Sequence, residues 1–269
     1  MSNGDARPIG VFDSGIGGLT VVSALRRLLP HESIYYVGDT ARVPYGGKSP
    51  TTVQRYSLEI ASLLLRENSK TVVVACNTAS SVALAALEAE LPVSVTGVIA
   101  PGAEAALAVT RNGHVGVIGT RATIKSGSYE RALRALSSDV RVTAAACPLL
   151  VPLIEEGWLA GEITEKVLMQ YLRPLADAGI DTLVLGCTHY PLLRSTIGRL
   201  LGDGVSLVDS AENCAASVRA LLGREKLNTA TGQTGRLRVA LTDPPDSFLR
   251  IANDALQLDV GEVEVRAIG

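Results

Sequence analysis

Aromatic residues, cysteines and histidines are all scarce in this chain of 269 residues. With two Phe, one Trp and seven Tyr, the core must be built mainly from aliphatic side chains, and a hydrophobic content of 47% is ample for one. The four cysteines form no C-x-x-C pair, which argues against a disulfide scaffold, a zinc ribbon and a thioredoxin-like site. The histidines, at positions 31, 114 and 189, lack metal-ligand spacing, so we expect no metal.

An excess of charge of one sign is also missing. The chain has 25 basic and 27 acidic side chains, so we expect no nucleic-acid partner and no attraction to acidic lipid. The first residues, MSNGDARPIG, lack the basic start and apolar core of a signal peptide. The uncharged stretch at 71–87 is interrupted by polar residues and falls short of the ~20 apolar residues of a membrane span. These absences predict a soluble, cytoplasmic protein with reduced thiols and no membrane partner.

Short β-branched runs alternate with longer segments of helical periodicity along the chain. This alternation predicts an α/β fold with mainly parallel sheets covered on both faces. We expect strands at 8–12, 33–37, 71–75, 93–99, 114–118, 140–146, 181–185, 205–208, 237–241 and 263–267. We expect helices at 17–29, 50–67, 79–90, 103–110, 121–136, 162–178, 192–201, 211–222 and 245–256. The polar stretch at 228–235, rich in Thr and Gly, predicts a surface loop.

Two segments share one pattern, in which an apolar strand is followed by a small residue, a cysteine and polar side chains. They are VVVACNTAS at 72–80 and LVLGCTHYP at 183–191, far enough apart to belong to different domains. Ligands of parallel α/β folds collect beyond the carboxyl ends of the strands, where Cys76 and Cys187 stand. A helix starting directly after each cysteine would stabilise the thiolate, so we expect both thiols to have a lowered pKa.

The residues after the two cysteines suit the starts of helices. Asn77, Thr78 and Thr188 are capping types, and free N–H groups beside them can hold a carboxylate. If the two segments face each other, a small molecule between them meets one sulfur on each side. That arrangement predicts a two-base proton transfer, in which one thiolate takes a proton from carbon and the opposite thiol returns one to the other face. For Cys147 and Cys214 we expect only a packing role.

Other loops that follow predicted strands carry supporting groups. Asp13 and Ser14 begin the segment DSGIGG, which can orient a catalytic group and grip an anion, although the same residues suit an Asx turn. The loop at 44–47, PYGG, can close over a site, and His189 stands two residues after Cys187. The sequence GGKS at 46–49 resembles the end of a P-loop, but Arg42 occupies the position of its first glycine.

Four motifs together resemble those of the glutamate racemases. They are VFDSGIGGLTV, YVGDTARVPYG, VVACNTASS and LVLGCTHYPLL, in this order, and the resemblance runs from about residue 9 to residue 222. A further pattern near 242–252 also looks like that of the family. The resemblance implies an isomerase that interconverts L- and D-glutamate without pyridoxal phosphate or metal and supplies D-glutamate for peptidoglycan.

The resemblance also implies roles for individual residues. Cys76 would take the α-proton from D-glutamate and Cys187 from L-glutamate, while Asp13 and His189 assist the adjacent thiols. Glu155 would support the histidine, with Glu156 competing for that role. The positions that match the family's substrate contacts are Asp13, Ser14, Tyr45, Gly46, Asn77, Thr78, Thr188 and His189.

The fold implied by the resemblance is a pair of similar, doubly wound α/β domains with the active site in the cleft between them. The chain would cross between them near Gly97 and Val208, so that 1–97 plus 209–269 form the first domain and 98–208 the second. We expect closure of the domains over the substrate, and a homodimer, since members of the family are often dimeric. Some glutamate racemases bind DNA gyrase, and the sequence leaves that side role open.

Three alternatives remain at this stage. An aspartate or hydantoin racemase would use the same two thiols, although Thr188–His189 and the loop at 44–46 favour glutamate. A cysteine hydrolase with Cys187 as nucleophile and His189 as base would leave Cys76 unexplained, and neighbours two residues apart need not point at each other. A binding protein that retains the pocket without catalysis is the third.

Overall fold

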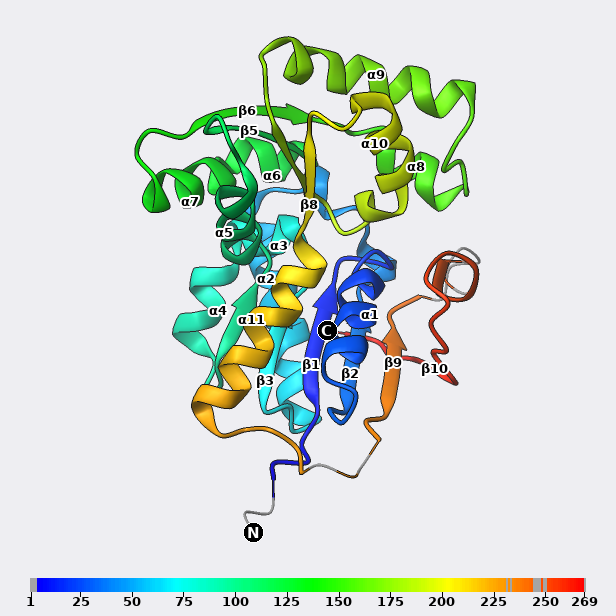
Figure 1. Ribbon diagram of the computed structural model, residues 1–269. Helices are drawn as coiled ribbons and strands as arrows, with labels where there is room; N and C mark the ends of the chain where they lie inside the picture. The colour runs from blue at the N-terminus through cyan, green and yellow to red at the C-terminus, as the bar shows by residue number, and fades with distance from the viewer. Residues whose placement is uncertain (1–3, 231, 233, 244–247, 249–250, 269) are drawn as a thin grey trace.

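Two parallel sheets form the framework of the protein (Figure 1). The computed structural model describes residues 4–230, 232, 234–243, 248 and 251–268, without the side chains of 254 and 255. The first sheet has the order β10-β9-β2-β1-β3-β4, and the second has the order β6-β5-β7-β8. Every pair of neighbouring strands is parallel, so the predicted α/β class is confirmed.

The strands are short, and those at the centre of each sheet are buried at every residue, as expected for a sheet covered on both faces. The first sheet contains β1 (Ile9–Asp13), β2 (Ile34–Gly38), β3 (Thr71–Val74), β4 (Val95–Gly97), β9 (Leu237–Leu241) and β10 (Val263–Val265). The second contains β5 (His114–Gly119), β6 (Arg141–Ala146), β7 (Thr182–Gly186) and β8 (Ser206–Asp209).

Helices cover both sheets and close four separate hydrophobic clusters. Those connecting or flanking the strands of the first sheet are α1 (Leu19–Leu28), α2 (Pro50–Arg66), α3 (Asn77–Val82), α4 (Leu84–Glu90) and α11 (Ser210–Glu225). Those that follow residue 98 and precede β8 are α5 (Ile99–Val109), α6 (Arg121–Ser126), α7 (Ser128–Leu136), α8 (Leu150–Glu155), α9 (Glu162–Asp177) and α10 (Arg194–Leu201). Within the described part of the chain, none of the helices combines the length and apolarity needed to cross a bilayer.

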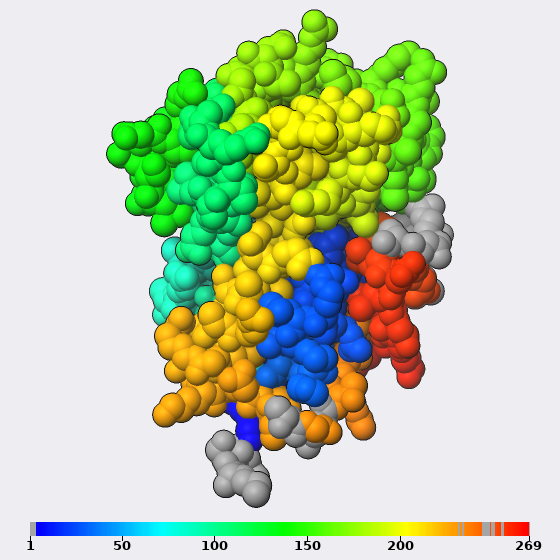
Figure 2. Space-filling model, in the orientation of Figure 1, coloured from blue at the N-terminus to red at the C-terminus, as the bar shows by residue number. Residues whose placement is uncertain are grey.

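The chain passes between the two sheets twice, once after β4 and once after β8. In Figure 2 the middle of the chain, green to yellow, makes up the upper half, whereas the segments near both ends lie in the lower half. The predicted domain boundary at 97/98 falls directly after β4, and the one at 208/209 falls one residue before the end of β8. The division of the chain into domains at these places stays a prediction.

Several predicted helices are interrupted or shifted in the structure. The helix expected at 79–90 begins earlier, at Asn77, and is split into α3 and α4. The one expected at 121–136 is broken at Gly127, whose φ of +66° favours glycine. The helix expected from residue 192 begins only at Arg194, after a 3₁₀ turn at Tyr190–Leu193. Much of the helix expected at 245–256 lies outside the described residues, and Ile251–Ala255 forms a turn of π-helix.

A buried ion pair ties together four segments that are distant in the sequence, at the amino ends of the strands of the first sheet. The Nζ atom of Lys70, a side chain with no exposed surface, lies 2.5 Å from Oε2 of Glu32. The same ammonium donates to the carbonyl oxygens of Asp5 and Leu227, each at 2.7 Å. Thr229, in the predicted surface loop, donates its backbone N–H to Oε1 of Glu32 at 2.8 Å. The start of that loop is therefore held against the sheet by a charge that burial makes costly to leave unpaired.

Replacing Lys70 with methionine should destabilise the protein by about 3–5 kcal/mol, because the carboxylate of Glu32 then stays buried without its counter-charge. Urea unfolding followed by circular dichroism measures the loss, with Lys125→Met, an exposed position, as the control. The pair Lys70→Met/Glu32→Gln should recover part of the stability. A single variant as stable as the wild type would contradict this account of the ion pair.

Candidate active site

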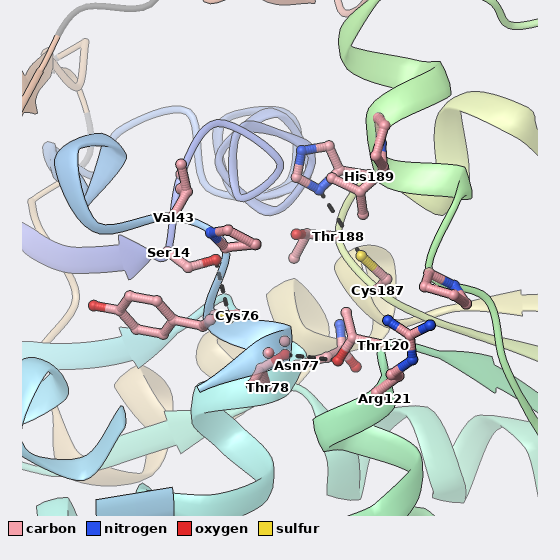
Figure 3. A pocket seen from close by; sticks show the side chains of 18 of the residues that line it. Ser14, Val43, Cys76, Asn77, Thr78, Thr120, Arg121, Cys187, Thr188 and His189 are labelled. Atoms are coloured by element: carbon pink, nitrogen blue, oxygen red, sulfur yellow. Dashed lines mark hydrogen bonds between the residues drawn. The ribbon is translucent and has the colours of Figure 1, made fainter. Parts of the chain in front are cut away.

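A cavity of about 340 Å³ lies between the loops at the carboxyl ends of both sheets (Figure 3). Ten of the eleven predicted site residues line it. They are Ser14, Tyr45, Gly46, Cys76, Asn77, Thr78, Glu155, Cys187, Thr188 and His189. The eleventh, Asp13, is the last residue of β1 and lies fully buried, behind the residues that line the cavity.

The strand order explains why these residues meet. In the first sheet β1 lies beside β2 and β3, and in the second β5 lies beside β7. Because the strands are parallel, the loops that follow them gather at one edge of each sheet. Ser14 follows β1 and Cys76 follows β3 closely, whereas Cys187 comes directly after β7. The two cysteines therefore reach one cavity from different sheets.

Cys76 is a buried thiol, with 4% of its surface exposed. Its sulfur accepts the backbone N–H of Ala79 at 3.4 Å and lies 3.5 Å from Oγ of Ser14, so Cys76 itself caps α3. Burial and, second, the charge of Asp13 raise the pKa of the thiol to about 12, and the contacts with Ser14 and Ala79 lower it by less. The lowered pKa expected from the helix start is therefore wrong for Cys76, because the loss of solvation outweighs two weak hydrogen bonds.

Asp13 organises the loop behind Cys76. Its Oδ2 accepts the backbone N–H groups of Gly15 at 3.2 Å and Gly18 at 3.0 Å, as in the Asx turn considered from the sequence. Its Oδ1 is buried and has no hydrogen-bond partner within the described chain. Gly18 is required here, since a Cβ atom at that position would lie 2.5 Å from Cβ of Asp13.

The second cysteine stands in a chain of polar contacts. The Cys187 sulfur lies 3.8 Å from Nδ1 of His189, and Nε2 of His189 lies 3.1 Å from Oε1 of Glu155. Burial by itself lowers the pKa of His189, but Cys187 and Glu155 together raise it to about 10. The imidazole is therefore held as a cation at neutral pH. Of the two neighbouring carboxylates, Glu155 lines the cavity and contacts the histidine, and Glu156 is not among the lining residues.

The surroundings of Cys187 differ from the prediction in one respect. No α-helix starts directly after it, because the chain forms the 3₁₀ turn Tyr190–Leu193 before α10 begins at Arg194. Thr188 therefore caps no helix, and its carbonyl oxygen accepts the hydroxyl of Thr20 at 3.1 Å. Positive charge near this sulfur comes from the imidazolium of His189.

Hydroxyl and amide groups join the two halves of the site. Oγ1 of Thr78 lies 3.0 Å from Oγ1 of Thr120, which caps α6. Oδ1 of Asn77 accepts the hydroxyl of Tyr129 at 2.6 Å, and its Nδ2 donates to Ser210 at 3.4 Å. The bonds to Thr120 and Tyr129 hold the first turn of α3 against α6 and α7.

Two glycines in loops of the first sheet allow these loops to lie close to residues that follow strands of the second sheet. A Cβ atom on Gly17 would lie 2.4 Å from Nδ1 of His189, and one on Gly46 would lie 2.8 Å from Cβ of Thr120. Tyr45 lines the cavity, but its hydroxyl donates to the buried carboxylate of Asp39. The predicted loop at 44–47 is thus packed against α6 in this structure.

Two polar residues of the cavity wall were not predicted from the sequence. Thr120 and Arg121 line the cavity, and they follow β5 in the same way that Cys76 follows β3. Their position directly after a predicted strand was the feature of the sequence that could have identified them as wall residues. Cys147, expected only to pack, also lines the cavity, although its sulfur contacts the carbonyl oxygen of Ala145 at 3.5 Å. Cys214 is buried in α11, and its packing role stands.

Comparison with known proteins agrees with this architecture. The model of the Asp/Glu/Hydantoin racemase family matches residues 18–218. The chain belongs to this family. It is 51% identical to the glutamate racemase of Geobacter metallireducens over 257 residues, which cover 96% of this chain and 95% of the relative. The predicted resemblance and the predicted enzyme class, an isomerase that racemises amino acids, are confirmed.

Solved structures of this family superimpose over nearly the whole chain. The glutamate racemase isoform RacE1 of Bacillus anthracis has a TM-score of 0.90 at 41% identity, with 97% of each chain covered. The glutamate racemase of Francisella tularensis, solved with D-glutamate, has a TM-score of 0.91 at 37% identity, with 98% of each chain covered.

Among the described residues of the present chain, no three His, Cys, Asp or Glu side chains are grouped as metal ligands.

The raised pKa of His189 predicts a pH-dependent contribution to stability. The folded protein holds this proton more tightly than the unfolded chain, whose histidine has an ordinary pKa of 6.5. The contribution is therefore complete below pH 6.5 and disappears as the pH rises through about 10. We expect the stability difference between wild type and His189→Gln to shrink over that range.

Urea unfolding at pH 6.5, 8 and 10 measures this difference. His31→Gln is the control, because His31 is exposed and does not line the cavity. A difference for His189→Gln that stays constant from pH 6.5 to 10 would show that the imidazole is not held as a cation.

Proposed function

We propose that this protein is a cofactor-independent glutamate racemase that interconverts L- and D-glutamate by proton transfer between Cys76 and Cys187. The observation that carries the proposal is the placement of these two thiols on one cavity from two different sheets. A bound α-carbon between them can lose a proton on one face and gain one on the other, which inverts the centre. The similarity to glutamate racemases over nearly the full length supports glutamate as the substrate.

The two thiols have different surroundings, which fits a reaction that starts with one thiol protonated and the other deprotonated. A two-base transfer needs one thiolate and one thiol at the same time. Burial and Asp13 raise the pKa of Cys76, which favours the protonated form, whereas the sulfur of Cys187 lies 3.8 Å from Nδ1 of His189, whose pKa is raised to about 10. In this state Cys187 takes the α-proton of L-glutamate, and Cys76 gives its own proton to the opposite face to form D-glutamate. The reverse direction begins with the proton on Cys187.

Substrate binding follows from groups around the thiols. The backbone N–H groups at the first turn of α3, at Asn77 and Thr78, suit the α-carboxylate. The buried, unpartnered Oδ1 of Asp13 suits the substrate ammonium group. Hydrogen bonds to the carboxylate also stabilise the negative charge that develops as the α-proton leaves, which matters because no electron sink such as pyridoxal phosphate is part of the proposed reaction.

The alternative functions differ in which of the two cysteines they would use. The contact between Cys187 and His189 exists, so the cysteine hydrolase hypothesis gains its nucleophile and base, but Cys76 would then have no task. An aspartate or hydantoin racemase would use both thiols and differ in the substrate alone. A binding protein without catalysis would show no proton exchange at all.

The cellular role follows the same proposal. D-glutamate would serve peptidoglycan synthesis in the cytoplasm, and the protein would act as a homodimer whose two domains, 1–97 plus 209–269 and 98–208, close over glutamate.

Incubation with L-glutamate in deuterated water, without added cofactor, tests the reaction. We expect deuterium at the α-carbon and loss of optical rotation until the two enantiomers are equal. Parallel incubations with L-aspartate and with a hydantoin separate the related racemases, and release of ammonia or acid identifies a hydrolase. No exchange and no change in rotation with glutamate would refute the proposed function.

Replacement of each thiol tests the two-base assignment. Cys76→Ser and Cys187→Ser should each lower kcat for racemisation by about 10²–10⁴-fold, because a serine hydroxyl is a far weaker acid than a thiol and is hardly ever ionised to act as the base. Cys214→Ser is the matched control, since this buried thiol lies in α11 and does not line the cavity. A Cys76 or Cys187 variant with the rate of the control would remove that residue from the mechanism.

A further inference from the structure

Arg121 is a cationic residue on the wall of the cavity. It lies outside the four motifs that carry the resemblance to the glutamate racemases. It is the first residue of α6, directly after the cap Thr120, and it is exposed. Figure 3 shows its guanidinium pointing from the start of α6 toward the cavity, on the same side as Cys187 and Thr120. Among the described residues that line the cavity, it is the one Lys or Arg.

Among the described residues, Arg121 forms no ion pair and no side-chain hydrogen bond. Arg42, by contrast, binds both Asp39 and Glu59. On the same wall Glu155 contacts His189, and His189 also contacts Cys187. The guanidinium of Arg121 is therefore left without an ion-pair partner among the described residues.

The position of Arg121 in its helix makes the charge more unusual. The first turn of a helix carries partial positive charge, so a cation there is unfavourable and an acidic residue is favoured. The first turn of α6 has no acidic residue, and its basic neighbour Lys125 stands in the last turn, where a cation is favourable. An arrangement that breaks a local rule without a compensating contact is expected at functional positions. An anionic ligand in the cavity would supply the missing partner.

We propose that Arg121 binds the side-chain carboxylate of the substrate and so selects an acidic amino acid over a neutral one. This inference rests on the proposed racemase function. The α-carbon must lie between two buried sulfurs, which are 4% and 5% exposed. The α-carboxylate is bonded directly to that carbon and stays deep in the cavity. The exposed guanidinium is thus placed for the more distant carboxylate, which it can bind with two parallel hydrogen bonds.

Steady-state kinetics of variants tests the role of Arg121. Circular dichroism gives kcat and KM for both enantiomers of glutamate, and α-deuterium uptake gives the rate with L-glutamine, which has a neutral side chain. For Arg121→Ala we expect KM for glutamate to rise about tenfold in both directions, equivalent to about 1.4 kcal/mol, with kcat within about threefold. The preference for glutamate over glutamine should fall by a similar factor. Arg121→Lys, which keeps the charge but cannot form two parallel hydrogen bonds, should restore only part of the affinity.

The matched control is Lys125→Ala, which removes an exposed cation from the same helix without changing the cavity wall. It should leave KM and the preference for glutamate unchanged. If Arg121→Ala keeps both values within twofold of the wild type, or if Lys125→Ala changes them equally, the role of Arg121 is refuted while wild-type racemisation of glutamate still supports the proposed function. A wild-type protein that exchanges no α-proton of glutamate refutes both.

Discussion

The opposition of two strand ends across one cavity is the constraint on which the rest of this structure depends. In the proposed reaction, a proton leaves one face of a carbon and another is returned to the opposite face, and the edge of the first sheet supplies the group for one side. The second sheet provides the other side. Its β5 and β7 repeat the parallel pairing of β1 and β3, so that Cys187 meets the cavity as Cys76 does. The remaining contacts between the halves serve to hold these edges face to face.

Neighbouring charges then distinguish two similarly buried thiols. Both cysteines are nearly inaccessible to solvent, yet Cys76 lies near the carboxylate of Asp13, and Cys187 lies beside a histidine whose pKa is raised by Cys187 and Glu155. A negative neighbour favours the protonated form of a titratable group, and a positive neighbour favours the deprotonated form. In the proposed reaction, the difference between acid and base would thus come from the residues behind two identical side chains.

Much of the fold and of the site could be predicted from the sequence, because the relevant residues stand directly after apolar strands. The α/β class, the two cysteines that line the cavity and the loops at 13–18 and 44–47 follow from that pattern and from the family motifs. The pKa of Cys76 could not, since a linear sequence shows the helix start but not how much solvent is lost. The role of Cys147 in the wall and the 3₁₀ turn after Cys187 depend on packing for the same reason. The place of Arg121 on the cavity wall could not be predicted either, because it depends on how the two sheets pack together.

Gly17 shows what the tight contact between the halves implies for access. Its missing side chain leaves room for the ring of His189, a residue of the opposite half, to rest on the loop after β1. In the proposed reaction, a movement that separates this ring from that loop would open the space between the two sulfurs to water. The protons on both thiols would exchange with bulk water while the halves are apart, and the stereochemical step would take place with those protons held inside.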